Sequence, residues 1–442
     1  MNVTTKTINE LRTKFLASPT NRLHMNAVTG AGIDRAAQAY EASINTPNTF
    51  SLQLPAGKIT AQKKSGRCWL FAACNVMRMP IIKNYNLEDD FELSQSYLFF
   101  WDKLEKANYF LENILATMDQ PQGSRVLDWL LMAPFGDGGQ WDMVVGLVKK
   151  YGVVPKTVMP DTASCEDSSK MNKLLTLKVR QYAKVLRDAH ANGETQKMLT
   201  TRKESMIEEI FNILCTCLGA PPMTFDFEIR TKDNHFIQDL ALTPMRFFEK
   251  YVAINLSDYV SLINSPTSDK PFYRTYTVAH LGSVIEASPI HYLNIPIEEL
   301  KVAVLKQLQD NESVWFGSDV GQMLDRNNGL MSLDTFDYET LMGTTFPMDK
   351  AARLDYGESL MTHAMVITGA NLVDGKPNRW KVENSWGDDI GAKGWFRMSD
   401  EWFNEYVYQA VINKKHLSKE QVDALSTEPI VLNPWDPMGS LA

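Results

Sequence analysis

The sequence lacks the features of a secreted or membrane protein. It has five cysteines in 442 residues, an odd and sparse set that fits reduced thiols better than a disulfide framework. The N-terminus mixes polar and apolar residues, without the basic start, apolar run and small-residue cleavage site of a secretory signal. No apolar run approaches the roughly 18 to 20 residues of a membrane-spanning helix. We therefore expect a cytoplasmic protein that does not bind a membrane.

An excess of positive charge is also missing. Lys and Arg number 45 against 53 Asp and Glu, which gives a formal net charge of -8, and basic residues form nothing longer than doublets. The charge balance therefore gives no support for a nucleic-acid partner. Hydrophobic residues make up 44% and charged residues 22% of the chain, which is ordinary for a soluble globular protein.

An apolar stretch behind a Gly-containing loop predicts a buried helix. Residues 68–79 carry large apolar side chains in nearly every helical direction, so this helix should be buried on most sides. We expect it to end at Met79, because Pro80 follows. Cys68 then stands at its first position, where the positive end of the helix dipole favours a thiolate.

Other periodic segments indicate an α+β fold with a β-rich C-terminal third. Residues 141–151 predict a helix closed by Gly152, and two amphipathic helices are expected between Cys165 and Gly219. A further helix is expected over 297–308. The strand-like segments are 313–320, 365–370, 379–384 and 393–398.

Three segments supply the groups that a thiol peptidase needs. The chemistry requires a thiolate, an imidazole that moves its proton, a group that orients the imidazole, and donors for the oxyanion. Cys68 is the candidate nucleophile, and Gln62 lies six residues earlier, where its amide could turn towards the same place. His363 precedes an apolar strand, and Asn384 follows another. An Asn amide can fix the imidazole tautomer by accepting its far N–H, and Trp386 could shield that bond from water.

A structural explanation of Cys68 was weighed against the catalytic one. A Cys in an apolar helix is most often a core residue, which suits Cys74, Cys215 and Cys217. For Cys68 this interpretation leaves Gln62, the Gly turn and the ordered His and Asn motifs unexplained. Cys215 and Cys217 have no second ligand pair at zinc-finger spacing. We therefore expect neither a metal site nor a cofactor.

The three motifs resemble those of papain-like cysteine peptidases. QKKSGRCW resembles the nucleophile motif, THAMVITGA the histidine strand and ENSWGDDIGAKGW the asparagine motif, in the family's order. His363 follows Cys68 by 295 residues, whereas papain has roughly 130 to 150, so about 150 residues are inserted. With SGRCWLFA and the ending WDPMGSLA, the chain is similar over almost its whole length to the bleomycin hydrolase and aminopeptidase C group.

Three residues depart from these patterns. Ser65 stands where the papain motif has its first Cys, a disulfide partner in secreted relatives, which agrees with a reducing compartment. Arg67 replaces a small residue, as in a narrower group of the family. The chain ends in GSLA where the group leads us to expect GALA, so Ser440 replaces an alanine in the C-terminal arm.

The resemblance implies a papain-like two-lobe fold, with one helical and one β-barrel-like lobe and a large helical insertion. It also implies a homohexameric barrel whose active sites face an inner channel, a C-terminal arm in each cleft, and no long N-terminal propeptide. The expected divisions are an N-terminal arm (1–50), a helical lobe with the nucleophile (51–164), a helical insertion for oligomerisation (165–265), a β-rich lobe with His and Asn (266–430) and the C-terminal arm (431–442).

Further site residues follow from the resemblance. Gly138 and Gly139 match the Gly-Gly of the papain cleft wall, whose backbone pairs with an extended substrate, because residues without a Cβ permit so close an approach. The terminal carboxylate of Ala442 matches the group's device for binding the free amine of a substrate.

The leading hypothesis is a cysteine aminopeptidase that removes N-terminal residues from peptides through a Cys68 thioester. One alternative is an endopeptidase of the same group, whose tail does not close the cleft. A second alternative is a barrel-shaped binding protein for nucleic acid or another partner, with incidental peptidase activity. That protein needs a basic inner lining, which the net charge of -8 does not favour.

Overall fold

One large sheet forms the centre of the computed structural model, which describes residues 2–440. The strand order is β14-β5-β6-β4-β13-β7-β10-β11-β12-β9-β8, with β1 paired to β10. Most neighbours are antiparallel, and three pairings are parallel. The strands are β1 (Leu52–Gln53), β4 (Tyr259–Ile263), β5 (Arg274–Val278), β6 (Tyr292–Asn294), β7 (Val314–Ser318), β8 (Leu324–Asp325), β9 (Leu330–Met331), β10 (His363–Val373), β11 (Lys376–Glu383), β12 (Trp395–Ser399), β13 (Val407–Asn413) and β14 (Ile430–Leu432).

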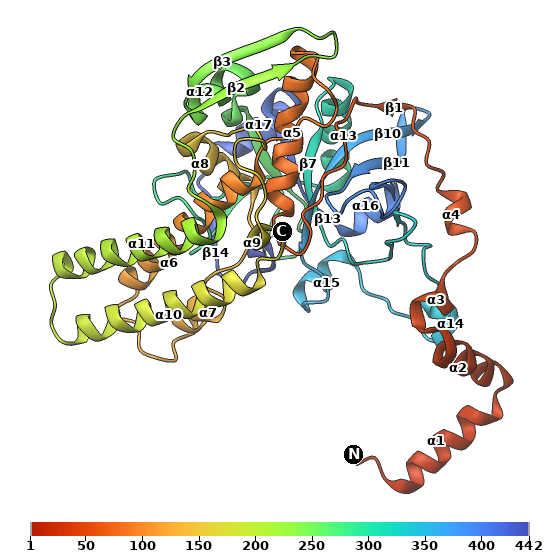
Figure 1. Ribbon diagram of the computed structural model, residues 1–442. Helices are drawn as coiled ribbons and strands as arrows, with labels where there is room; N and C mark the ends of the chain where they lie inside the picture. Colours follow the sequence, from red (N-terminus) through yellow and green to blue (C-terminus); the bar gives the residue numbers. More distant parts are fainter. Residues whose placement is uncertain (1, 441–442) are drawn as a thin grey trace.

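The helices lie mainly in the first half of the chain, so the expected α+β class is confirmed (Figure 1). No helix within residues 2–440 is both long and apolar enough to span a membrane. The helices are α1 (Thr5–Ala17), α2 (Pro19–Ala31), α3 (Ile33–Ala37), α4 (Ala42–Asn45), α5 (Cys68–Asn84), α6 (Gln95–Ala116), α7 (Arg125–Met132), α8 (Trp141–Tyr151), α9 (Ala163–Glu166), α10 (Ser169–Ala191), α11 (Gln196–Leu218), α12 (Pro244–Phe247), α13 (Ile297–Gln309), α14 (Tyr338–Met342), α15 (Lys350–Asp355), α16 (Asp400–Tyr406) and α17 (Lys419–Leu425), with short turns η1 (Phe248–Val252), η2 (Leu256–Asp258), η3 (Lys414–His416) and η4 (Pro437–Gly439).

Helix α5 lies between the other helices and the sheet and packs against β10. Its expected burial is confirmed, because most of its side chains are inaccessible to solvent. The expectation that it ends at Met79 is wrong, since the helix continues through Pro80 to Asn84. Ile81 and Ile82 are buried in the core, and this packing holds the last turn although Pro80 donates no backbone hydrogen bond.

The other predicted elements are confirmed. The segment 141–151 is α8, residues 297–308 fall in α13, and the four strand-like segments contain β7, β10, β11 and β12. Gly152 ends α8 with a φ of +71°, and a Cβ there would lie 2.3 Å from the carbonyl carbon of Pro244. Both the backbone conformation and the close contact therefore require glycine at this position.

The two helices of the expected insertion pack within the chain. Helices α10 and α11 lie side by side and bury their apolar faces against α6 (Figure 1). The segment is not wholly helical, because β2 (Phe225–Arg230) and β3 (Phe236–Leu242) form an antiparallel hairpin. Phe225 and Phe227 are its buried side chains, and both rings pack against Phe247. Strand β4 also lies inside the range expected for the insertion, although it belongs to the large sheet.

The N-terminal arm projects from the rest of the chain (Figure 1). Helices α1 and α2 contain no buried residue. Their exposed apolar side chains include Ile8, Leu11 and Phe15. The arm is attached further along, where the hydroxyl of Tyr338 donates to Asp34 at 2.8 Å.

A buried ion pair joins the helical part of the chain to the sheet. The guanidinium of Arg78, on α5, lies 2.9 Å from the carboxylate of Glu383, at the end of β11, and both side chains are at most 2% exposed. Arg78 also donates to the carbonyl of Lys58 at 2.7 Å. Removing one partner of a buried pair leaves the other charge without compensation.

We expect Glu383→Ala to lower the free energy of unfolding by about 3 to 5 kcal/mol, because the Arg78 guanidinium would remain buried and unpaired. Urea denaturation followed by tryptophan fluorescence measures this change. Asp423→Ala is the matched control, because its pair with Lys419 is exposed and should contribute only about 0.3 to 0.5 kcal/mol. Equal small effects of the two substitutions would contradict the assigned role of the buried pair.

Candidate active site

Cys68 is the first residue of α5 and is 2% exposed. Backbone N–H groups of Ala364 and Trp69 donate to its sulfur. Ala364 follows His363 at the start of β10. The nucleophile of the helical lobe and the histidine of the sheet are therefore brought together at the contact between α5 and β10, as the motifs predict.

His363 is paired with Asn384 in a way that fixes its tautomer. Nε2 of His363 lies 2.9 Å from Oδ1 of Asn384. The same oxygen accepts the backbone N–H of Ser385 at 2.7 Å, and since a backbone N–H can only donate, the atom facing the imidazole is the amide oxygen. Nε2 therefore carries a hydrogen, and Nδ1 is the nitrogen that can receive the thiol proton.

Trp386 covers this pair. Its ring centroid lies 4.9 Å from that of the His363 imidazole, and both His363 and Asn384 are at most 4% exposed. The guanidinium of Arg326 lies 4.5 Å from the Trp386 ring centroid, on the exposed surface. The hydrogen bond that orients the imidazole is thus shielded from water.

Burial disfavours each charged form on its own. It raises the pKa of the Cys68 thiol to about 11, although the N–H groups of Ala364 and Trp69 oppose the rise. Burial also lowers the pKa of His363 to about 4, against the hydrogen bond from Asn384, and the charge of Arg326 lowers it further. The thiolate and the imidazolium are therefore stabilised mainly by each other, so the two groups titrate as a pair.

The turn before Cys68 is closed by hydrogen bonds. Gln62 Nε2 donates to the carbonyl of Ser65, and Ser65 Oγ donates to that of Gln62, both at 2.7 Å. The hydroxyl of Ser385 donates to Gln62 Oε1 at 2.7 Å. The second amide hydrogen of Gln62 is left for another acceptor, and its role at an oxyanion stays a prediction.

The two departures from the papain nucleophile motif have structural roles. Ser65 occupies the position of the disulfide cysteine and accepts from Arg67 Nε at 2.9 Å. The Arg67 side chain is fully buried and pairs with Asp161 at 2.8 Å. Its guanidinium also lies 5.1 Å from the Phe71 ring centroid. Polar and cation–π contacts therefore hold this turn where a secreted relative would use a covalent link.

Asp137 is a site residue that the sequence analysis missed. Its carboxylate accepts the backbone N–H of Gly66 at 3.0 Å and the ammonium of Lys103 at 2.6 Å. The Ser168 hydroxyl donates to the same carboxylate, and the Asp137 carbonyl accepts the Trp69 indole N–H at 2.8 Å. Burial alone would raise the pKa of Asp137, but Lys103 and these donors hold it well below its usual range. The only sequence signal was an acid inside the GDGG loop.

Gly139 lacks a side chain for a reason other than the one expected. A Cβ there would lie 2.5 Å from the Trp69 indole, so the glycine allows this ring to pack under the loop. The carbonyl of Gly138 accepts the Lys106 ammonium at 2.6 Å. Backbone pairing of Gly138 and Gly139 with a substrate stays a prediction.

The C-terminal arm lies beside the candidate catalytic residues. Gln140 Nε2 donates to the carbonyl of Ser440 at 2.6 Å, and the Ser440 hydroxyl donates to the carbonyl of Met361. Gln140 follows the Gly138-Gly139 loop, and Met361 lies two residues before His363. Ser440, expected to be a mild replacement, therefore bridges the two walls of the site. Ala442 lies outside the described residues.

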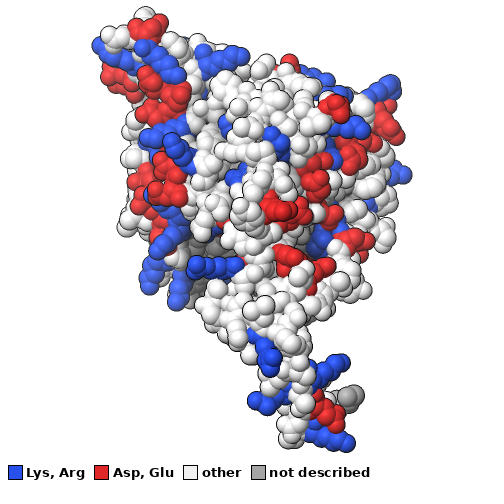
Figure 2. Space-filling model, turned by 90° about the vertical axis from the view of Figure 1, so that its right-hand side faces the viewer, with Lys and Arg blue, Asp and Glu red and all other residues white. Residues whose placement is uncertain are grey.

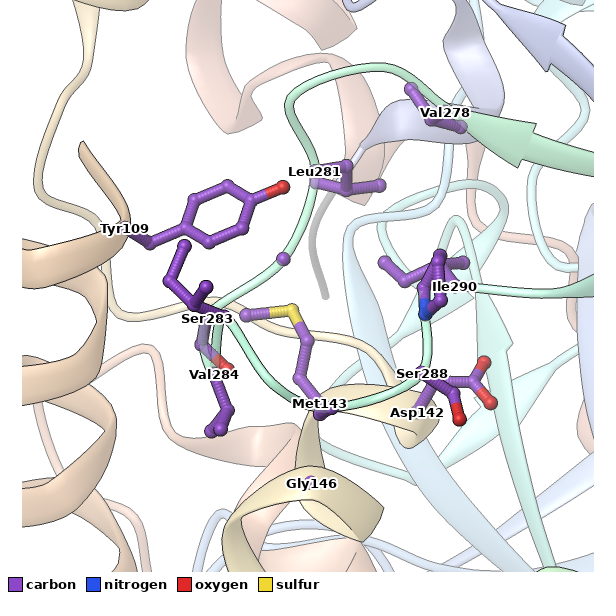
Figure 3. A pocket seen from close by; sticks show the side chains of 14 residues that line it. Tyr109, Asp142, Met143, Gly146, Val278, Leu281, Ser283, Val284, Ser288 and Ile290 are labelled. Carbon is purple, nitrogen blue, oxygen red and sulfur yellow. The ribbon is translucent and has the colours of Figure 1, made fainter. Parts of the chain in front are cut away.

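A cavity of about 130 Å³ adjoins the arm on its other side. Figure 3 shows Met143 of α8 extending into the space between Tyr109 and Ile290. Asp142 lines this cavity, and burial raises its pKa to about 6. A Cβ on Gly439 would lie 3.1 Å from Val278, which also lines the cavity. None of the candidate catalytic residues borders this space.

One side-chain cluster within residues 2–440 has the composition of a metal site. Ligand atoms of Asp310, Glu312 and His416 lie within 4.8 Å of one another. The ammonium of Lys415 already contacts both carboxylates. These residues are absent from the groups that surround Cys68, so the thiol chemistry described here uses other side chains.

The fold and the site together define a papain-type thiol hydrolase, and the comparisons agree. The chain belongs to the Peptidase C1-like family, which matches residues 2–439. It is 49% identical to aminopeptidase C of Streptococcus thermophilus over 94% of each chain, and 43% identical to bleomycin hydrolase of Mus musculus over 87% of this chain and 86% of that one. The crystal structure of PepW from Lactobacillus rhamnosis HN001 has a TM-score of 0.98 at 48% identity, covering 100% of this chain and 99% of that one. The resemblance inferred from the motifs is thereby confirmed.

We expect Gly139→Ala to lose most activity and to destabilise the protein by about 1 to 3 kcal/mol, because its new methyl group would displace the Trp69 ring beside the nucleophile. Gly136→Ala is the matched control in the same loop, since no atom lies within 4 Å of a Cβ built there. Thermal unfolding and the rate of iodoacetamide labelling of Cys68 measure the two effects. If both variants behaved like wild type, the contact with Trp69 would not explain Gly139.

Proposed function

We infer that the protein is a cysteine aminopeptidase, which removes residues one at a time from the N-terminus of a peptide. The observation that carries this inference is the position of Ser440, which bonds to Gln140 on one wall and to Met361 on the other. An arm held there fills the cleft on the side where an endopeptidase would bind further substrate residues. Only a short N-terminal part of a peptide then fits beside Cys68.

The proposed reaction begins with proton transfer from Cys68 to Nδ1 of His363. The thiolate attacks the scissile carbonyl, and the imidazolium returns its proton to the leaving amine as the thioester forms. Water then hydrolyses the thioester with His363 as the base. Asn384 holds the imidazole in position through Nε2–H. The Cys68 backbone N–H and the free amide hydrogen of Gln62 would bind the oxyanion, and loss of one such donor typically costs about 10² to 10³ in rate.

The free amine of the substrate is the second element of this proposal. The terminal carboxylate of Ala442 would bind that ammonium, and two residues separate it from the anchored Ser440. Gly138 and Gly139 would present the backbone that pairs with the substrate. An ion pair in such a partly desolvated place contributes more than one on the open surface.

Deleting residues 439–442 should convert the enzyme towards endopeptidase action, because the cleft would open and the amine would lose its partner. We expect loss of most activity on aminoacyl-coumarins and new cleavage of N-acetylated peptides. Paired fluorogenic substrates with free and acetylated amines measure the ratio. The same deletion combined with Cys68→Ser should be inactive on both, which assigns the new activity to this site.

Iodoacetamide labelling of Cys68 controls for the integrity of the truncated protein. An unchanged ratio of amino- to endopeptidase activity in a truncated enzyme that still labels would favour the endopeptidase alternative. Wild-type cleavage of only the acetylated substrates would have the same meaning.

A cytoplasmic homohexamer is the proposed state of the protein. The reduced cysteines support the compartment, since all five are free. The N-terminal arm supports assembly, because α1 and α2 expose Leu11 and Phe15 and bury no residue. Helices α10 and α11 were expected to form the subunit contacts, but their apolar faces already pack on α6. We therefore assign the main contact to the arm.

Light scattering at micromolar concentration should give about six times the chain mass of 50.1 kDa. Leu11→Asp should lower this mass, because Leu11 is 60% exposed on the unpartnered α1. Leu177→Asp, at a 67% exposed position of α10, is the matched control and should leave the mass unchanged. A monomer for the wild type would refute the assembly, and dissociation by Leu177→Asp alone would return the contact to the insertion.

The alternative of a nucleic-acid-binding barrel has no support on the visible surface. Figure 2 shows positive and negative side chains interspersed over one face of the molecule, and the projecting arm carries both signs. A partner that binds phosphates through released counterions needs a continuous basic region.

A further inference from the structure

An exposed cation stands beside the catalytic histidine without a partner in the described residues. Arg326 lies in the loop between β7 and β8, and its guanidinium stacks on Trp386 at 4.5 Å. No carboxylate oxygen within residues 2–440 lies within 4.0 Å of its nitrogens, although Asp388 and Asp389 follow Trp386 closely in the sequence. A guanidinium held on a ring face keeps its N–H groups free at the edges for a planar anion.

The leaving group of the proposed reaction must pass close to Arg326. His363 gives its proton to the leaving amine, so the scissile nitrogen comes within hydrogen-bond reach of the imidazole. The arm, Gln140 and Met361 close the opposite side of the site. The remaining chain of the substrate therefore extends on the side of Trp386, whose ring packs on the imidazole.

The distances fit a short leaving group. Trp386 lies 4.9 Å from the imidazole and 4.5 Å from the guanidinium, so the two charged groups are separated by about 10 Å at most. An extended chain covers about 3.3 to 3.6 Å per residue. A carboxylate that ends a leaving group of one or two residues can therefore reach Arg326, whereas that of a longer peptide passes beyond it.

We propose that Arg326 is a specificity-determining residue that binds a carboxylate of the leaving group, which makes dipeptides and tripeptides with a free C-terminus preferred substrates. This inference rests on the proposed aminopeptidase function and adds the recognition of the departing side. The carboxylate is the C-terminal one in our proposal. An acidic side chain next to the scissile bond offers the same chemistry and is tested separately.

The experiment compares matched substrates rather than absolute rates. Arg326 also lowers the pKa of His363, so Arg326→Gln changes turnover of every substrate, but this effect cancels in a ratio. The ratio is kcat/KM for a dipeptide over that for its C-terminal amide, with the N-terminal residue that the wild type cleaves best as an aminoacyl-coumarin. Release of the free amino acid is followed by mass spectrometry.

We expect the wild type to prefer the free acid and Arg326→Gln to lower this preference about three- to fivefold, the size of an exposed ion pair. High salt should lower the wild-type preference in the same direction, and Arg326→Lys should retain part of it. The preference should decline for peptides of five or more residues. Arg230→Gln is the matched control, because Arg230 is likewise exposed and stacked on a ring, that of Phe236 in the distant β2–β3 hairpin.

A second pair of substrates separates the two sources of carboxylate. Amidated dipeptides with Glu or Gln after the scissile bond should show no Arg326-dependent difference if the C-terminal carboxylate is the ligand. A difference confined to that pair would overturn our assignment in favour of the side chain. Equal ratios for wild type and Arg326→Gln on all pairs would overturn the inference while leaving the aminopeptidase function intact. Absence of amino acid release from every substrate would instead overturn the proposed function, and this inference with it.

Discussion

The nucleophile depends on one buried carboxylate. Asp137 accepts the backbone N–H of Gly66, two residues before Cys68, and its own carbonyl accepts the indole of Trp69. The same carboxylate binds Lys103 of α6 and, through Asn172 at 2.7 Å, the start of α10. A charge this far from water is tolerated because every lone pair has a donor. The turn, the glycine wall and the insertion therefore keep fixed positions relative to one another, and the helix dipole of α5 acts on a thiol that cannot move away from it.

The second half of the site is held by the sheet. Strands β10 and β11 are neighbours, with Val366 opposite Glu383, so the residue before Asn384 and the strand of His363 share a register. Glu383 in turn is fixed by Arg78 of α5. One helix thus supplies both the nucleophile, at its N-terminus, and the cation that holds the end of β11. This arrangement explains how side chains 316 residues apart in the sequence keep hydrogen-bond geometry: the contacts that position them belong to the same helix–sheet interface.

Local signals predicted much of this structure, and long-range contacts account for what they missed. The helix of Cys68, the strands of His363 and Asn384 and the helices around residues 141–218 follow from periodicity and motif. Pro80 did not end α5, because burial of the following isoleucines outweighs a local preference. The β2–β3 hairpin was missed because its strands are short and its apolar residues are satisfied by distant aromatic rings. Asp137, Gln140 and Met361 carry no motif at all, and their roles depend on residues 30 to 300 positions away. Gly139 was identified for a substrate contact, whereas its most direct constraint is Trp69.

The arm adds a specificity element without changing the chemistry. Cys68, His363 and Asn384 would cleave a peptide wherever it could lie across them, and nothing in their geometry distinguishes an end from an interior. Ser440 occupies hydrogen-bonding groups of both walls at once, and Met438, buried to 4% exposure, seats the preceding turn, with its carbonyl accepting the Tyr292 hydroxyl at 3.3 Å. Asp436 pairs with Lys270 at 2.9 Å, so the turn is fixed at two separate points. A segment anchored by packing, an ion pair and backbone hydrogen bonds costs little further entropy when substrate binds. Selection for a peptide end therefore comes from the pre-ordered chain end, while the catalytic groups remain those of a general thiol peptidase.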